Sequence, residues 1–100
     1  MLRVTIFDSP REQRLVLEGR LTEPWLAELE LAWKQTQTVR QGRKCVVDLT
    51  GATLIDEHGK RILIAMCNEG VQFIAHGVAT IHLIKEIRRK CWRQQASERC

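Results

Sequence analysis

The chain has 100 residues, 44% of them hydrophobic, and a formal net charge of +4. This length predicts a single domain, and the apolar content is too high for a disordered chain. No apolar stretch reaches the roughly 18 residues that cross a bilayer, and the first residues lack the charged-then-apolar pattern of a secretory signal. We therefore expect a cytoplasmic protein with no membrane span.

The first segments predict a β-hairpin. Apolar and polar residues alternate over residues 2–6, which is the period-two pattern of a strand with one buried face. Residues 9–12 contain serine and proline, which favour a turn. Residues 13–18 are predicted to form the second strand, which Gly19 is expected to close.

A helix is expected after this hairpin. Residues 22–24 are Thr, Glu and Pro, which supply a capping hydroxyl, an acid for the positive helix end and a proline tolerated in the first turn. Four apolar residues then share one helix face: Trp25, Leu29, Ala32 and Trp33. The two tryptophans are interpreted as core anchors, and the polar segment 36–42 ends the helix.

The middle of the chain predicts a buried strand and a second helix. Cys45, Val46 and Val47 form a short apolar run of the kind that is buried on both faces inside an α/β sheet. Residues 50–55 are expected to form a loop, after which Asp56 caps a helix. That helix stops at Gly70, and its inward face is expected to consist of Ile62, Leu63, Ala65 and Met66.

A strand over residues 71–75 and a helix over residues 79–92 complete the predicted order β–β–α–β–α–β–α. One face of the last helix carries Leu83, Ile84, Ile87 and Cys91. Strands alternating with helices predict an α/β fold, here a mixed four-stranded sheet with three main helices. The expected core includes Val46, Val47, Ile62, Met66, Phe73, Leu83 and Ile87.

The positive charge is concentrated at the end of the sequence. Residues 1–83 hold ten basic and ten acidic side chains, whereas residues 84–100 hold six basic and two acidic ones. Such a segment suits nucleic acid, an anionic membrane surface or an acidic partner, although a solvated helix end is the commoner explanation. We expect a domain over residues 1–92 and a basic tail over residues 93–100 that extends or frays the last helix without adding a strand.

The four cysteines are expected to be reduced thiols without a catalytic role. Cys45 and Cys67 lie in apolar runs, and Cys91 and Cys100 lie in the basic segment. No pair has the C-x-x-C spacing of a zinc or redox site, and the three histidines (His58, His76 and His82) lack metal-ligand spacing. We expect no metal and no cofactor.

The most unusual local sequence is Asp56-Glu57-His58-Gly59, at the start of the second predicted helix. Asp56 and Glu57 place negative charge at the positive helix end, and Glu57 has an i, i+4 neighbour in Arg61. An acid, a base and a ligand side by side invite an enzymatic interpretation. Consecutive residues entering a helix diverge, however, and the chain has neither a Gly-rich phosphate loop nor a nucleophile elbow. We therefore expect no enzyme; the plainest alternative is that Asp56 only caps and Gly59 only packs.

Three stretches resemble the STAS domain family, named for sulfate transporters and anti-sigma-factor antagonists. The run over residues 46–59, VVDLTGATLIDEHG, is similar to that family's apolar strand ending in Asp-Leu and its following Ile/Met-Asp-Ser-Ser-Gly turn. Leu17-x-Gly19-x-Leu21 resembles the family's second strand and its exit, and Glu69-Gly70 its later glycine turn. The likeness covers roughly residues 2–90.

The resemblance implies a phosphorylation switch whose key residue is changed here. In the family, a kinase-type anti-sigma factor phosphorylates the Ser or Thr after the signature Asp, and the phosphate blocks binding. Asp56 matches that Asp, Gly59 matches the signature Gly, Glu57 stands at the phosphoacceptor position and His58 replaces the second Ser. Glu57 carries about −1 charge against about −1.5 to −2 for phosphoserine, so the switch is either fixed in a partly phosphate-like state or lost.

The resemblance also implies a role and a difference in fold. We expect a non-enzymatic adaptor in bacterial signalling upstream of sigma-factor availability, with Asp56, Glu57, His58, Gly59 and Arg61 as its partner-binding residues. Alternatives are an accessory subunit of a membrane transport system and nucleic-acid binding through residues 85–93. The family's last strand and helix are not evident in this sequence, which leaves a sheet edge that favours pairing with another chain, including a second copy.

Overall fold

The computed structural model describes residues 1–39 and 43–99, with side chains described over residues 1–37 and 43–91. Its elements follow the order β–β–α–β–α–β–α, which confirms the predicted order. They are β1 (Leu2–Asp8), β2 (Glu12–Leu21), α1 (Leu26–Val39), β3 (Lys44–Ile55), α2 (Glu57–Asn68), β4 (Gln72–Ile74) and α3 (Val78–Arg99).

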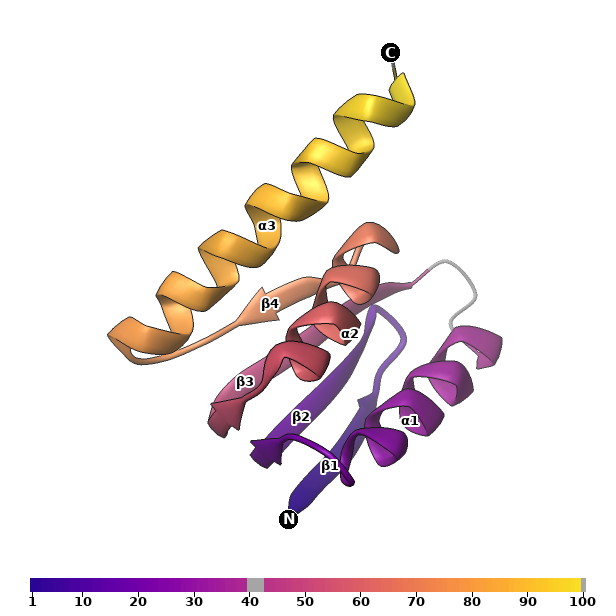
Figure 1. Cartoon of the computed structure of the whole chain (residues 1–100). Helices are drawn as coiled ribbons and strands as arrows, with labels where there is room; N and C mark the ends of the chain where they lie inside the picture. The colour runs from indigo at the N-terminus through magenta and orange to yellow at the C-terminus, as the bar shows by residue number, and fades with distance from the viewer. Residues whose placement is uncertain (40–42, 100) are drawn as a thin grey trace.

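The four strands form one mixed sheet in the order β1-β2-β3-β4. β1 pairs antiparallel with β2, whereas the β2–β3 and β3–β4 pairs are parallel. Figure 1 shows α1 and α2 lying across one face of this sheet, with α3 at its β4 end. The predicted α/β class, with a mixed four-stranded sheet and three helices, is therefore confirmed.

One apolar core joins the sheet to all three helices. It takes alternate residues of the central strands, such as Leu15 and Leu17 of β2 and Val47 of β3, because alternate side chains of a strand share a face. The helices contribute Leu26, Leu29, Ala32, Leu63, Met66, Ile84 and Ile87. Val46 is also buried, but by the same alternation it belongs to the opposite face of the sheet, outside this core.

The predicted core was largely right, with differences at single positions. Met66, Phe73 and Ile87 are buried, whereas Ile62 and Leu83 are only half-buried and pack against the edge of the core. The prediction that Ala65 faces inward was wrong. The buried residues Leu63 and Met66 lie about one turn apart on the same face of α2. Ala65 lies outside that face and is exposed.

The expected loop over residues 50–55 is instead the second half of β3. β2 runs past Gly19 to Leu21, and the longer β2 pairs with this part of β3 as far as Leu21↔Ile55. Gly19 has a φ of 100°, and a Cβ there would lie 2.2 Å from the Met1 carbonyl oxygen. It marks an irregularity within the strand, where the register shifts, and does not end it.

Helix α1 begins later than predicted, at Leu26. Residues 22–25 form a turn in which the Trp25 N–H donates to the Thr22 carbonyl oxygen at 2.9 Å, and the Glu23–Pro24 peptide bond in this turn is cis. Pro24 therefore precedes the helix. Trp25 is 36% exposed, so its interpretation as a core anchor was wrong; Leu26 is the buried residue that begins the inward face.

The last helix agrees with its predicted face. Ile84, Ile87 and Cys91 are buried, and α3 packs chiefly on α2. Its backbone is helical as far as Arg99, so the basic segment continues this helix over the described residues. No helix in the described part of the chain is long and apolar enough to cross a membrane.

Candidate functional site at the start of helix α2

Asp56 holds the first turn of α2 in place. Its backbone is extended, with φ −86° and ψ −178°, and its side-chain oxygen Oδ1 accepts the Gly59 N–H at 2.7 Å. The Asp56 N–H in turn donates to the Leu21 carbonyl oxygen at 3.3 Å. Asp56 is therefore the N-cap that the sequence predicted, and it also ties the start of the helix to the end of β2.

Gly59 lets the helix approach β2 closely. Gly59 is buried, and a Cβ at this position would lie 2.6 Å from the Leu21 carbonyl oxygen and 3.2 Å from Cγ2 of Ile55. Atoms do not come this close without rearrangement, so a side chain here would push α2 away from the strand ends. The packing role that the sequence predicted for Gly59 is thus what the structure shows.

Glu57 is the first residue of α2, and its side chain is 77% exposed. Its Oε1 lies 3.2 Å from Nζ of Lys60, one turn along the helix. The carboxylate thus turns to the i+3 lysine and not to its i+4 neighbour Arg61. Arg61 is exposed on the same helix.

His58 contacts a different part of the chain. Its Nδ1 pairs with Oε1 of Glu23, in the turn that precedes α1. Both side chains are about half exposed. This contact brings the 22–25 turn, with the exposed Trp25, beside the start of α2.

The side chains of Asp56, Glu57 and His58 diverge, as the sequence predicted. Asp56 turns inward to the Gly59 N–H, Glu57 pairs along the helix with Lys60, and His58 pairs with Glu23. The three polar groups therefore do not converge on one point where a substrate atom would react. Among the described residues, no group of three or more His, Cys, Asp or Glu side chains gathers in a way that suits a metal ion.

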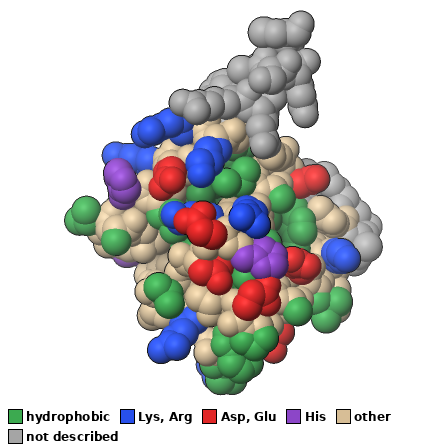
Figure 2. All heavy atoms as spheres, in the orientation of Figure 1, with side chains coloured by type: hydrophobic (Ala, Val, Ile, Leu, Met, Phe, Trp, Pro, Cys, Tyr) green, Lys and Arg blue, Asp and Glu red, His purple; other side chains and the backbone are tan. Residues whose placement is uncertain are grey.

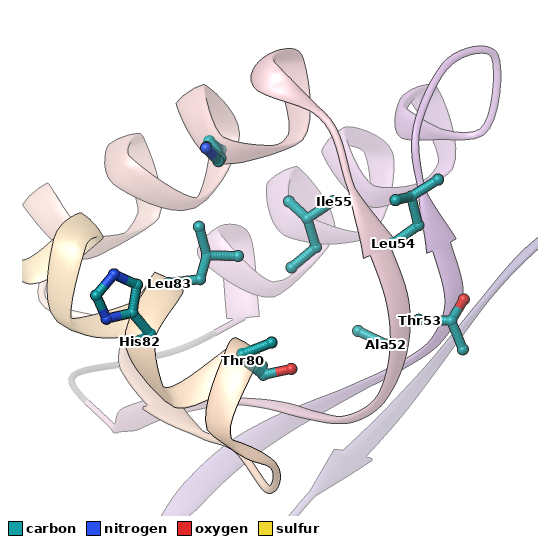
Figure 3. Close-up of a pocket in the computed structure, with 9 residues that line it drawn as sticks. Ala52, Thr53, Leu54, Ile55, Thr80, His82 and Leu83 are labelled. Carbon is teal, nitrogen blue, oxygen red and sulfur yellow. The ribbon is translucent and has the colours of Figure 1, made fainter.

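A hollow of about 290 Å³ adjoins this helix start. It lies between the end of β3, the first turns of α2 and the start of α3, and Lys60 lines it. Figure 3 shows Ile55 of β3 and Leu83 of α3 on opposite walls, with Thr53, Thr80 and His82 around them. Its lining is thus mainly apolar, with a few polar groups. Beside it, Leu54 is 55% exposed.

Charged side chains surround this region. Figure 2 shows acidic, basic and histidine side chains close together on the face that carries the helices. Over the helix start, the charged groups are the Glu57–Lys60 and His58–Glu23 pairs and the exposed Arg61. An apolar hollow with a charged border is therefore available to a macromolecular partner.

Sequence reasoning missed three contributors to this surface. The i, i+3 spacing of Glu57 and Lys60 was a usable signal for that pair. Glu23 is far from His58 in sequence, and no local pattern links the two. Leu54 was missed because residues 50–55 were expected to form a loop. In the structure Leu54 belongs to β3 and pairs with Arg20 of β2.

Compared with known proteins, the chain matches no family model, and no curated protein matches it.

Proposed function

We propose that the chain is a non-enzymatic, STAS-like protein-interaction domain whose partner-binding surface is centred on the start of α2. The observation that carries this proposal is the fixed, outward presentation of Glu57. Asp56 caps the turn beneath it, Gly59 sits tightly against Leu21, and the Glu57 side chain remains 77% exposed. A charge held on a rigid, capped helix end costs little to order when a partner binds.

The surroundings of Glu57 support a protein partner over a small substrate. The hollow beside Leu54 and Ile55 offers a place for an apolar side chain of the partner, and the charged groups around it form a polar rim. Protein interfaces typically combine buried anchors with such a rim. The divergence of Asp56, Glu57 and His58 also favours binding over catalysis.

The partner class comes from the resemblance. A kinase-type anti-sigma factor in bacterial cytoplasmic signalling is the partner that a STAS-like antagonist would bind, with Asp56 and Gly59 at the family's signature turn and Glu57 at its phosphoacceptor position. In that family phosphate at this position blocks binding, whereas the proposed partner of this chain accepts the permanent carboxylate of Glu57, whose charge is smaller than that of phosphoserine.

Replacing Glu57 tests this proposal. We expect Glu57→Ser to weaken binding to a kinase-like anti-sigma factor by at least about tenfold, since a charge at an interface is worth up to several kcal/mol. The matched control is Glu69→Ser, because Glu69 is an exposed acid at the opposite end of α2. Stability of Glu57→Ser should fall by only about 0.3–1 kcal/mol, the value of a helix-dipole contact and an exposed pair.

The measurements are isothermal titration of each variant and a thermal melt of each. Equal affinity of wild type and Glu57→Ser, together with a large fall in melting temperature, would make Glu57 a structural residue and would remove the basis of the proposal. If instead Glu69→Ser changed affinity as much as Glu57→Ser, the contact would be a general charge effect and not a surface centred on α2's first turn.

Phosphorylation gives a second test. Because a carboxylate replaces the phosphoacceptor hydroxyl at Glu57, we expect no phosphate on residues 50–59 after incubation with the same kinase-like protein and ATP. Mass spectrometry of the tryptic peptides provides the measurement. Phosphate on Thr50 or Thr53, both exposed on β3, would show that the switch has moved to another residue.

The accessory-subunit alternative uses the same surface with a different partner. A transporter or its ATPase encoded beside the gene, binding with the same Glu57 dependence, would favour that alternative over the anti-sigma factor.

A further inference from the structure

The outer edge of β4 is an open end of the sheet. β4 is the last strand in the order β1-β2-β3-β4 and pairs with β3 at three positions, from Val46↔Gln72 to Asp48↔Ile74. No strand among the described residues lies on its other side. Backbone N–H and C=O groups that point away from β3 are therefore available to another extended chain.

A groove of about 200 Å³ runs between this edge and α3. Its lining is apolar where it meets the core, through Phe73 and Ala75 on the strand side and Ile81 and Ile84 on the helix side. A strand added beside β4 would place alternate side chains toward the helix layer, where this groove lies. The groove thus lies where it can accept alternate side chains of a strand added beside β4.

The border of the groove is basic. Lys85 and Arg88 line it from α3, both are exposed, and neither has a salt bridge to another described residue. Residues 84–91 of α3 hold four basic side chains and one acidic side chain, so the charge of this part of the helix is positive. An occupant with carboxylates near Lys85 and Arg88 complements this charge.

The charge also argues against a second copy as the occupant. Pairing two β4 edges would bring two basic borders toward each other, and like charges that approach across a sheet destabilise it. The described residues cannot supply a fifth strand either, because α3 is helical as far as Arg99.

We propose that the β4 edge and the β4–α3 groove bind an extended, acidic segment of another protein, which adds to the sheet as a strand. Apolar side chains of that segment enter the groove between Phe73 and Ile84, and its carboxylates meet Lys85 and Arg88. This surface is separate from the start of α2 and does not depend on the function proposed there.

The probe is a labelled, end-capped peptide with the sequence Glu-Thr-Val-Thr-Val-Thr-Glu, which puts valine and glutamate on the same face of a strand. We expect saturable binding by fluorescence anisotropy with a Kd below about 1 mM. Binding should weaken at least about tenfold, equivalent to about 1.4 kcal/mol, in the Lys85→Glu/Arg88→Glu variant. Arg89→Glu, an exposed arginine that does not line the groove, is the matched control and should bind like wild type.

A second peptide tests strand addition itself. Replacing the three threonines by proline keeps the charge and removes ladder N–H groups, and we expect at least about tenfold weaker binding for it. Hydrogen exchange at Gln72–Ile74 should slow when the threonine peptide binds. Glu57→Ser should leave this binding unchanged, which separates the two surfaces.

Several results would overturn the proposal. These are no saturable binding of the threonine peptide, equal binding of the proline peptide, or equal binding by the Lys85→Glu/Arg88→Glu variant. Binding of an oligothymidylate in place of the peptide, lost in that same variant, would assign the basic border to nucleic acid. Slow exchange at Gln72–Ile74 that depends on protein concentration alone would assign the edge to a second copy.

Discussion

At position 59 the chain has no room for a side chain. A Cβ there would meet the Leu21 carbonyl oxygen at 2.6 Å, and backbone atoms of a paired strand do not move aside cheaply. In an open helical position, Gly→Ala stabilises a protein by roughly 1 kcal/mol. At Gly59 the close approach of Leu21 should instead make the substitution by alanine destabilising.

We expect Gly59→Ala to destabilise the fold by about 1–3 kcal/mol, the usual cost of overpacking. Urea unfolding followed by circular dichroism measures this change. Arg61→Ala, an exposed change on the same helix, should stay within about 0.5 kcal/mol of wild type. A Gly59→Ala variant as stable as wild type or more stable would show that α2 does not pack against β2 as closely as described.

The residues at the start of α2 show what a sequence can and cannot predict about a site. The cap at Asp56 was predictable because capping depends on the local chain, and its acceptor contact reaches only three residues ahead. The His58–Glu23 pair was not predictable from the sequence, because the two residues meet only when the fold brings the turn before α1 beside α2. The surface of a site is therefore harder to predict than its backbone support.

At the scale of single elements, the parallel β2–β3 pair contains a bulge in β3 directly after Asp48. The register runs from Val16↔Asp48 to Glu18↔Gly51, so β3 has one extra residue at this point. Oδ1 of Asp48 accepts the Thr50 N–H at 2.9 Å across the bulge. The hydroxyl of Thr50 holds the pKa of Asp48 below its ordinary value against the opposing effect of burial, with smaller contributions from the Thr50 N–H and Arg14.

This lowered pKa has a definite consequence in acid. A carboxyl with a lower pKa in the folded chain stabilises the fold above its unfolded pKa of about 3.9, and the contribution is lost as pH falls through the folded pKa. Thr50→Ala removes the main cause, so it should raise the pKa of Asp48 in a carboxyl NMR titration. It should also reduce the pH dependence of the unfolding free energy below about pH 4.

Thr53→Ala, at a second exposed threonine of β3, is the control for the acid experiment and should leave the Asp48 titration unchanged. If Thr50→Ala also leaves it unchanged, the Thr50 hydroxyl is not the group that lowers the pKa of Asp48.

The packing of α2 on α3 brings together two thiols from separate segments of the sequence, a buried one at Cys91 and a half-buried one at Cys67. Burial raises the pKa of Cys67 to about 12, and the neighbouring Cys91 thiol adds to this shift. The thiolate is the reactive form, so at pH 8 alkylation of Cys67 by iodoacetamide should be on the order of 10³-fold slower in the folded chain than in denaturant. Peptide mass spectrometry after a short pulse measures this ratio. Equal rates in the two states would mean that the α2–α3 contact opens freely.

Two differences between expected and observed elements have a common physical cause. Gly19 and Trp25 were interpreted from intrinsic preference, the glycine as a strand end and the tryptophan as a core residue. Strand pairing carries β2 through Gly19, and the 22–25 turn leaves Trp25 outside the helix. In both cases tertiary context overrode a single-residue preference.

For the whole molecule, the order of elements was predictable because each strand and helix carries its own hydrophobic period. Where the helices lie was not predictable from those periods alone. Because the core draws on all three helices, they cover one sheet face, and Phe7 on the other face remains 57% exposed. The molecule thus has a helix layer that carries the proposed surface at the start of α2 and an open edge at β4.

A map of backbone amide shifts of the ¹⁵N-labelled chain during titration with a kinase-like anti-sigma factor tests the proposed surface at the start of α2 most directly. We expect the largest changes on residues 53–61, around Asp56 and Glu57, and we expect Glu57→Ser to reduce them while Glu69→Ser does not. Large changes confined to β4 and α3 or to the open sheet face, with residues 53–61 unchanged, would contradict it.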